Sequence, residues 1–375
     1  MTATRPVVAL MLESDGPGGA EIMLLNLGLG LRDRGFDVFP VLPDNGPGWL
    51  ARQFRDRGFE PETFTLRRPV DWGCVRGLRE VFRRRGASLV HSHEFTMAVY
   101  GGVAAGINGL PHVITMHGNR NFARRWRRRA ALGWAVRRSR AVAAVSGALA
   151  GALTDALRLQ PGRVQVVPNG VELRPGDAAP IRSELRLGPE EPLILAVGNL
   201  YPVKGHMVLL QAAALLQRRR PELAWRLAIA GRGKEEAGLR QFVESQGLSG
   251  RVQLLGYRQD VPDLLAAASL WVMPSLSEGM PLALLEAMLG GKAIIASAVG
   301  AIPDVLADGK AGVLVPPGDA GALAGAMERL LLEPDRRNNL AAAARQQADP
   351  AYRLETMVGA YQKLYDLPVP APGAG

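Results

Sequence analysis

The sequence predicts an α/β protein with two parallel-sheet domains, and three observations support this. Short apolar, β-branched runs alternate with longer amphipathic stretches along the chain, a pattern typical of parallel sheets with helices on both faces. The alternation restarts after a Pro/Gly/Asp-rich passage from Pro168 to Pro180. A length of 375 residues also favours two domains over one. We therefore expect Rossmann-like domains at residues 1–172 and 173–350, facing a central cleft.

The expected strands are short and are separated by helix-length segments. In the first domain they are Pro6–Met11, Asp37–Leu42, Ser88–His91, His112–Met116, Ala141–Val145 and Gln165–Val167. In the second domain they are Leu193–Val197, Trp225–Ala230, Val252–Leu255, Leu270–Met273, Ala293–Ala296 and Gly312–Val315. Ligands of open parallel sheets bind beyond the carboxyl ends of the strands, so the functional loops should follow strands. A last helix is expected at 351–367, and 368–375 reads as a disordered tail.

The composition excludes several classes of protein. The single cysteine, Cys74, rules out an intrachain disulfide and a cysteine-based metal cluster. No run approaches 18 uninterrupted apolar residues, which argues against a membrane span. The apolar run from Val7 to Leu12 is followed by Glu13 and Asp15, so it reads as a strand and not as a signal peptide. We expect a cytoplasmic protein.

Positive charge is concentrated in the first half of the chain. Residues 1–172 hold 24 arginines, no lysine and 14 acidic residues, so this half accounts for the whole net charge of +10. The arginines are densest between Arg120 and Arg140, where Trp126 and Trp134 are interleaved. Such a segment suits an anionic membrane surface, which would make the protein peripheral on the inner face of the cytoplasmic membrane. An arginine-rich composition alone is the alternative, and nucleic acid is not expected because no nucleic-acid motif accompanies the charge.

Two common nucleotide-binding motifs are missing. The chain contains no G-x-x-x-x-G-K-[ST] segment, and the first strand is followed by Gly16-Pro17-Gly18-Gly19-Ala20-Glu21 in place of G-x-G-x-x-G. These absences argue against a nucleoside triphosphatase and against a dehydrogenase.

Residues 273–292 carry the most specific functional pattern. A short apolar strand leads into a polar loop with Glu278 and Gly279, and Pro281 suits the first turn of the helix that follows. That helix carries Glu286 and should stop at a glycine pair, Gly290 and Gly291. The backbone N–H groups and dipole of a helix N-terminus attract anions, so the segment predicts a site for an extended, partly anionic ligand.

The setting S-E-G-x-P-L-x-L-L-E-A-M-x-x-G around Glu278 and Glu286 resembles the Glu-x7-Glu signature of retaining glycosyltransferases of family four, which use nucleotide-sugar donors. The resemblance implies the GT-B fold, with the last helix crossing back onto the first domain. It also implies that Glu278 lies by the donor sugar and that Glu286 holds the ribose hydroxyls. The alternative for each is an ordinary solvated acid.

Further matches in the second domain concern the donor diphosphate. Gly198-Asn199-Leu200-Tyr201-Pro202-Val203-Lys204-Gly205 resembles the family's G-[RN]-L-x-x-x-K-G segment, whose lysine neutralises the diphosphate. Many relatives have arginine at Asn199, so we expect weaker diphosphate binding or compensation by Arg232. Tyr257 stands where relatives frame the nucleotide base. In the expected mechanism, Lys204 and the N–H groups around Gly279, Met280 and Leu282 stabilise the departing nucleotide.

In the first domain, Gly18 and Gly19 match a family Gly-Gly-Ala-Glu segment that faces the donor; a plain turn is the alternative. His117 ends a strand where a family histidine contacts a donor-sugar hydroxyl, so His117 and Glu278 are the expected catalytic residues. His93 matches a histidine bordering the acceptor cleft. His91 and His93 lie on one strand face, but no further ligands complete a metal site, and we expect none.

The resemblance implies transfer of a sugar from a nucleotide diphosphate sugar to a hydroxyl of a saccharide or lipid-linked acceptor, without metal or other cofactor. Bacterial envelope polysaccharide or glycolipid synthesis is the expected setting. Three alternatives remain open: a GT-B-fold nucleotide-sugar epimerase, a catalytically silent GT-B protein that acts as a partner in an envelope-synthesis complex, and a peripheral membrane-binding module with no enzyme activity.

Overall fold

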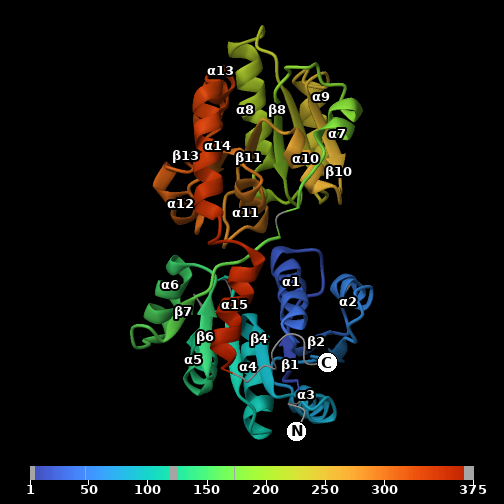
Figure 1. Ribbon diagram of the computed structural model, residues 1–375, viewed down its shortest axis with the longest axis vertical. Helices are drawn as coiled ribbons and strands as arrows, with labels where there is room; N and C mark the ends of the chain where they lie inside the picture. Colours follow the sequence, from blue (N-terminus) through green and yellow to red (C-terminus); the bar gives the residue numbers. More distant parts are fainter. Residues whose placement is uncertain (1–4, 47, 119–125, 173, 367–375) are drawn as a thin grey trace. The chain divides into compact units, whose positions relative to one another are not determined.

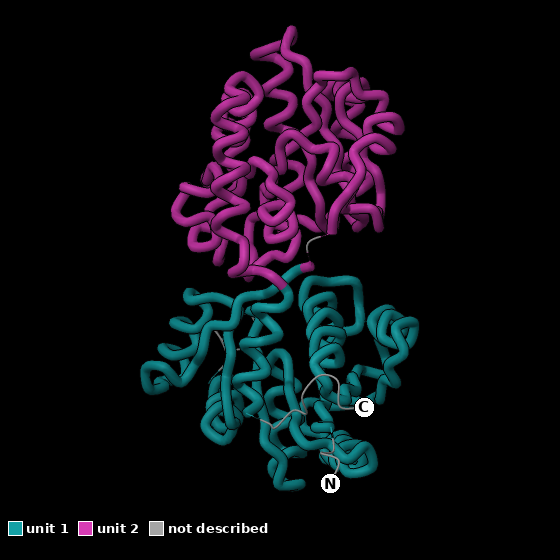
Figure 2. The backbone as a smooth tube through the Cα atoms, viewed as in Figure 1, with its two compact units in different colours: residues 1–171, 354–375 teal, residues 172–353 magenta. Residues whose placement is uncertain are grey.

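A computed structural model describes residues 5–46, 48–118, 126–172 and 174–366. The chain forms two compact units (Figure 2). Unit 1 comprises Met1–Val171 together with Leu354–Gly375, and unit 2 comprises Glu172–Arg353. The expected tail at 368–375 lies outside the described residues, as do Arg120, Arg124 and Arg125.

Unit 1 is built on a seven-stranded parallel sheet with the order β3-β2-β1-β4-β5-β6-β7 (Figure 1). Its strands are β1 (Val7–Met11), β2 (Asp37–Pro43), β3 (Glu62–Phe64), β4 (Leu89–His93), β5 (His112–Met116), β6 (Ala141–Ala144) and β7 (Val164–Val166). Its helices are α1 (Gly19–Asp33), α2 (Trp49–Arg55), α3 (Trp72–Arg84), α4 (Glu94–Ile107), α5 (Trp126–Arg138), α6 (Gly147–Leu157) and α15 (Leu354–Tyr365).

Unit 2 repeats the design with a six-stranded parallel sheet in the order β10-β9-β8-β11-β12-β13. Its strands are β8 (Leu193–Val197), β9 (Arg226–Ala230), β10 (Val252–Gly256), β11 (Leu270–Met273), β12 (Ala293–Ser297) and β13 (Val313–Val315). Its helices are α7 (Ala178–Glu184), η1 (Pro202–Lys204), α8 (His206–Arg219), α9 (Glu236–Ser245), α10 (Val261–Ala267), α11 (Leu282–Leu289), α12 (Ile302–Val305), η2 (Ala307–Gly309), α13 (Ala320–Leu332) and α14 (Pro334–Ala348).

The predicted α/β class with two Rossmann-like, parallel-sheet domains is confirmed. Fully apolar strands such as Leu193–Val197 are buried because helices cover both faces of a parallel sheet. One strand escaped prediction: β3 is only three residues long, and its sequence Glu-Thr-Phe has no apolar run.

Several helices begin where side chains satisfy the free N–H groups of the first turn. Asp71 accepts hydrogen bonds from the amides of Gly73 and Cys74 at the start of α3. Ser146 does the same for Leu149 at the start of α6, and Asp319 for Ala322 at the start of α13.

Helix α15 belongs to unit 1 although 182 residues of unit 2 precede it in the chain. It packs against α1, where Val358 lies over Gly30. Tyr361 and Tyr365 of α15 are fully buried. The core of unit 1 therefore includes side chains from both ends of the chain.

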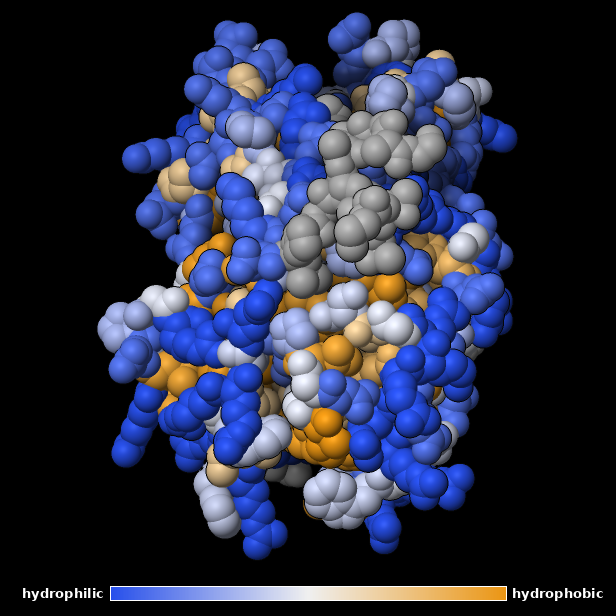
Figure 3. Space-filling model, turned by 60° about the horizontal axis from the view of Figure 1, so that its bottom comes forward, coloured by the Kyte–Doolittle hydropathy of each residue, from blue (hydrophilic) through white to orange (hydrophobic). Residues whose placement is uncertain are grey.

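Each sheet has one point at which the strand order reverses, and ligands of such folds bind beyond the carboxyl ends of the strands there. In unit 1 this point lies between β1 and β4, and in unit 2 between β8 and β11. Within the described part of the chain, no helix combines the length and the apolar character needed to cross a bilayer. Hydrophilic side chains cover most of the face seen in Figure 3, with apolar side chains gathered in patches between them.

Candidate functional site

The strand-order reversal of unit 2 brings Lys204 and Glu278 together. Lys204 ends η1, which follows β8, and Glu278 lies in the loop that follows β11. The Lys204 Nζ donates to Glu278 Oε1 at 2.7 Å and to Oε2 at 3.0 Å. The Ser275 Oγ donates to Glu278 Oε1 at 2.6 Å. The Glu278 side chain is only 7% exposed and that of Lys204 is 28% exposed, so this is a nearly buried ion pair.

Two glycines allow the loops of this site to approach one another. Gly205 has a φ of +67° and touches the Pro274 carbonyl, which a Cβ at that position would overlap. Gly300 has a φ of +57° and is packed in the same way against the carbonyl of Glu278. Both glycines combine a left-handed backbone with a close contact, so neither position has room for a side chain.

Helix α11 follows the Glu278 loop. Pro281 is its N-cap, with extended backbone, and the helix begins at Leu282, one residue later than the prediction of Pro281 in the first turn. Gly290 caps the helix at its carboxyl end, as predicted. Met280 and Leu282 are buried. The first N–H groups of a helix lack the usual carbonyl partner four residues earlier, and in α11 the N–H of Leu284 donates to the Pro281 carbonyl at 3.2 Å.

Glu286 lies within α11 and is half-buried. Burial raises the pKa of its carboxyl to about 7, and the nearby charge of Arg174 offsets part of that rise. A carboxyl that titrates near neutral pH can accept hydrogen bonds from neighbouring hydroxyls once it is ionised.

The remaining predicted donor residues of unit 2 lie on loops after β8, β9 and β10. Asn199 follows β8, and its neighbour Leu200 donates a backbone hydrogen bond to the Arg232 carbonyl at 3.0 Å. The Arg232 guanidinium lies 5.1 Å from the centre of the Tyr257 ring, a cation–π contact. Tyr257 is 49% exposed, so its ring is available to a planar ligand.

The strand-order reversal of unit 1 holds an acid that sequence reasoning missed, Glu94. It directly follows β4 and adopts a φ of +66°, which is unusual for a residue with a side chain. Its Oε1 accepts the backbone N–H of His117 at 3.0 Å. Burial and, secondarily, the charge of Glu13 raise its pKa to about 7. Strained residues of this kind concentrate at functional sites; the only sequence signal was an acid at the end of a strand.

Histidines occupy the same edge of the unit 1 sheet. His117 follows β5 and is half-buried, and burial lowers its pKa to about 4, so the ring is neutral at pH 7. Its Nε2 lies 3.0 Å from Nδ1 of His93. His93 is fully buried, and its ring packs on that of His91 with centroids 4.2 Å apart, as expected for residues on one strand face. Contact of His93 with an acceptor stays a prediction.

Gly18 and Gly19 lie where α1 begins, Gly18 as its N-cap and Gly19 as its first residue. The carboxylate of Glu21 folds back beside Gly18 and is buried there. The described residues include no group of three His, Cys, Asp or Glu that could hold a metal ion.

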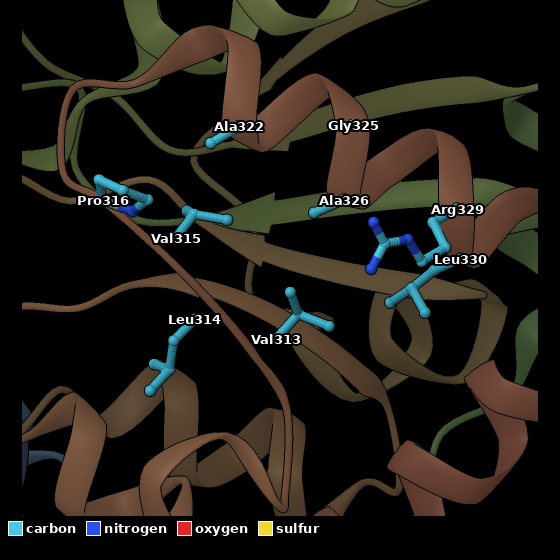
Figure 4. Close-up of a pocket in the computed structure, with 9 residues that line it drawn as sticks. All are labelled: Val313, Leu314, Val315, Pro316, Ala322, Gly325, Ala326, Arg329 and Leu330. Carbon is cyan, nitrogen blue, oxygen red and sulfur yellow. The ribbon is translucent and has the colours of Figure 1, made fainter.

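A half-open cavity of about 340 Å³ lies away from these residues, between β13 and α13 (Figure 4). Its lining is apolar apart from Arg329 and contains none of the predicted site residues.

Family models match nearly the whole chain. The model described as Glycosyltransferase Family 4 matches residues 17–174, and the model described as Glycosyl transferases group 1 matches residues 177–347. A D-inositol 3-phosphate glycosyltransferase of Frankia alni is 32% identical over 316 residues, which span 80% of this chain and 74% of that protein. The chain belongs to glycosyltransferase family four.

A second relative of this family-four enzyme is an alpha-maltose-1-phosphate synthase of Mycolicibacterium smegmatis, 31% identical and covering 72% of this chain and 76% of that protein. Among solved structures, HepE of Anabaena in complex with UDP and glucose aligns with a TM-score of 0.80 at 23% identity, over 96% of this chain and 99% of that one. A glycosyltransferase of Rickettsia africae aligns with a TM-score of 0.83 at 17% identity, over 96% and 98% of the two chains. The likeness to these structures establishes that the chain has the GT-B fold.

Proposed function

We propose that the enzyme is a retaining glycosyltransferase that moves a hexose from a nucleotide diphosphate sugar to a hydroxyl of a saccharide or lipid-linked acceptor. The observation that carries the proposal is the Lys204–Glu278 pair at the strand-order reversal of unit 2. It places a cation for phosphate and an acceptor for sugar hydroxyls side by side, where such folds bind ligands.

In this mechanism Lys204 stabilises the negative charge that develops on the departing diphosphate. Its ammonium has three protons, of which the Glu278 carboxylate engages two. Because the side chain is already held in place, it loses little conformational freedom when the donor binds. The N–H groups of Gly279 and Met280, in the loop before α11, and of Leu282, its first residue, add to this anion site.

The sugar and the nucleoside are held by other groups. Glu278 and the neutral ring of His117 hydrogen-bond to the donor sugar, and Glu286 accepts the ribose hydroxyls. Tyr257 contacts the base, and Asn199, Gly18 and Gly19 complete the donor contacts. His93 serves the acceptor side. The acceptor oxygen then bonds to the sugar carbon on the face that the nucleotide leaves, as the bond between that carbon and the diphosphate breaks. The hydroxyl proton passes to the departing diphosphate, and attack on that face retains the anomeric configuration.

The donor and acceptor can be found by direct assay. A panel of UDP-, GDP-, ADP- and TDP-sugars is screened for slow hydrolysis, and the active donor is then offered with acceptors that include D-inositol 3-phosphate and lipid-linked saccharides. UDP-glucose heads the panel because HepE was solved with UDP and glucose. D-inositol 3-phosphate is included because a relative bears that name.

We expect one donor to be cleaved, and the product to carry the donor's anomeric configuration by NMR. The Lys204→Ala variant should lose turnover, while the exposed control Lys310→Ala should retain it. A product with inverted configuration, a donor sugar epimerised without acceptor, or no cleavage of any donor that binds would each contradict the proposal.

Unit 1 also carries a surface suited to an anionic membrane, and we propose peripheral contact there during envelope saccharide synthesis. Trp126 and Trp134 are 68% and 36% exposed on α5, and their spacing places them on one side of the helix. Arg127 lies over the Trp126 ring at 5.4 Å and Arg138 over the Trp134 ring at 4.9 Å. Basic residues interleaved with tryptophan are typical of such surfaces.

Cosedimentation with vesicles containing anionic lipid tests this contact. Replacing Arg127, Arg128 and Arg129 by Ser should abolish binding to anionic vesicles. A matched triple replacement of Arg83, Arg84 and Arg85 should leave it intact, because two of these arginines pair with Glu60 and Glu62. Equal losses from both triples would show that total charge alone matters.

A further inference from the structure

Four of the five histidines in the chain belong to β4 and β5 or directly follow them: His91 and His93 in β4, His112 at the start of β5 and His117 just after its end. Burial lowers the pKa of each of them, so all four rings are neutral at pH 7. A neutral imidazole carries its proton on one nitrogen, and the hydrogen bond at the other nitrogen decides which.

Helix α15 determines the state of His91. Tyr365 of α15 has its hydroxyl 2.8 Å from His91 Nδ1, and the Thr115 Oγ1 lies 2.8 Å from His91 Nε2. Thr115 donates its own proton to the Tyr361 hydroxyl at 3.2 Å. The Thr115 oxygen therefore accepts from His91 Nε2–H, and His91 Nδ1 accepts from Tyr365. Both tyrosines are fully buried, so these roles are not shared with solvent.

His91 in turn supports His93. The two rings are in contact at 4.2 Å between centroids, and the His93 ring stacks on that of His117 at 5.3 Å and 17°. His93 Nδ1 and His117 Nε2 are 3.0 Å apart, which requires a proton on one of them. His93 Nε2 has no hydrogen-bond partner within the described part of the protein.

This unpaired nitrogen settles the direction of the hydrogen bond. A proton on His93 Nε2 would be a buried donor without an acceptor, which costs about 1–3 kcal/mol. The proton therefore sits on His93 Nδ1 and is donated to His117 Nε2. His117 consequently carries its own proton on Nδ1, and Glu94 anchors its backbone N–H. His112 faces elsewhere, with its Nε2 2.9 Å from Ser92 Oγ.

We propose that Tyr365 of α15 and His91 hold the ring of His93 in place, and that His93 fixes the orientation and tautomer of His117, so that His117 presents an N–H donor on Nδ1 to the donor sugar. Toward the donor sugar, His91, His93 and Tyr365 are positioning residues, and His117 is the group that touches it. The inference rests on the proposed function in assigning His117 to the donor sugar. It gives α15 a part in the active site and not only in the packing of unit 1.

The tautomer can be read directly by NMR. With histidine labelled by ¹⁵N, two-bond ¹H–¹⁵N correlations distinguish a protonated Nδ1 from a protonated Nε2, and five histidines give an assignable spectrum. We expect Nδ1–H for His117 and His93 and Nε2–H for His91. A wild-type His117 protonated on Nε2 would overturn the proposal, whatever the kinetics.

Kinetics of matched variants test the positioning role. His93→Phe removes the hydrogen bond, and we expect kcat to fall about 10- to 100-fold, the range for a misplaced catalytic group. His93→Asn places an amide N–H near the former Nδ1 and should recover most of that loss. Tyr365→Phe should lower kcat about 3- to 10-fold and shift the His91 and His117 signals. The affinity of all three variants for the nucleoside diphosphate alone should stay unchanged, because this ligand lacks the sugar that His117 contacts.

The control is Tyr100→Phe, which removes another hydroxyl of the same unit; this hydroxyl accepts from the Asp71 backbone N–H and donates to the Pro69 carbonyl. It should cost stability without changing kcat or the histidine spectrum. If His117→Ala abolishes turnover while Tyr365→Phe and both His93 variants keep wild-type kcat, the positioning chain is refuted and the proposed function stands. If wild type neither cleaves nor transfers any donor, the proposed function fails instead, and the NMR result still decides the tautomer.

Discussion

Replacing Lys204 by Ala should destabilise unit 2 as well as impair donor binding. The change leaves the Glu278 carboxylate, whose side chain is 7% exposed, with the hydrogen bond from the Ser275 hydroxyl but without its cation. Breaking a fully buried ion pair costs about 3–5 kcal/mol, whereas an exposed pair contributes about 0.2–1 kcal/mol. Because Lys204 is 28% exposed, we expect an intermediate loss of about 2 kcal/mol in the free energy of unfolding.

Urea unfolding followed by tryptophan fluorescence measures this loss, since Trp225 and Trp271 are fully buried in unit 2. A second replacement, Glu278→Gln, removes the stranded charge and keeps an oxygen for the Ser275 hydroxyl. The double variant should therefore be about 1 kcal/mol more stable than Lys204→Ala alone, a coupling of ordinary size for contacting residues.

The matched control is Lys292→Ala. The Lys292 Nζ donates to the Ala266 carbonyl within α10 at 3.4 Å and to the Ala268 carbonyl just beyond the helix at 3.2 Å. Loss of this side chain should therefore cost stability but little turnover. If the losses of unfolding free energy from Lys204→Ala and Glu278→Gln are strictly additive in the double variant, Lys204 is not the partner of Glu278. If Lys204→Ala and Lys292→Ala lose turnover equally, Lys204 is not the diphosphate ligand.

Four further predictions concern Glu286, Glu94 and Gly205. Glu286→Ala should weaken binding of both the nucleoside diphosphate and the sugar donor at least tenfold by calorimetry, and unchanged affinity for both would contradict the ribose assignment. Ribose hydroxyls favour the ionised carboxylate, so donor affinity should rise with pH through about 7 in wild type, with proton release below that pH, and this dependence should vanish in Glu286→Gln. The pKa of Glu94 is raised to about 7 in the folded protein, so its contribution to stability is fully present below pH 4.5 and is lost as the pH rises through about 7. The loss in the free energy of unfolding is at most about 3 kcal/mol. Glu94→Gln should flatten that part of the pH–stability curve, and a curve unchanged in this variant would contradict the role given to Glu94. Gly205→Ala should cost about 2 kcal/mol or more, because it combines a positive φ with overlap at Pro274, and near-wild-type urea unfolding would show that the loop has room to move.

The sequence alone was sufficient for the features that depend on neighbouring residues. Apolar runs such as Leu193–Val197 fix a buried strand through their own side chains, and the loop glycines and Pro281 mark where α11 begins. The spacing of the motifs places Lys204 and Glu278 after apolar strands, and thus at the sheet edge where ligands bind, with Glu286 in the helix that follows. The family followed from those motifs.

Tertiary structure decided what depends on residues far apart in the chain. The Lys204–Glu278 pair joins positions 74 apart, and the Tyr365–His91 contact joins positions 274 apart. No local pattern encodes such pairings, because they arise only when the strand order brings separate loops to one edge and α15 returns to unit 1. The strain at Glu94 and the unpaired nitrogen of His93 are of the same kind: burial and backbone geometry create them, and burial is a property of the folded chain and not of the residues themselves.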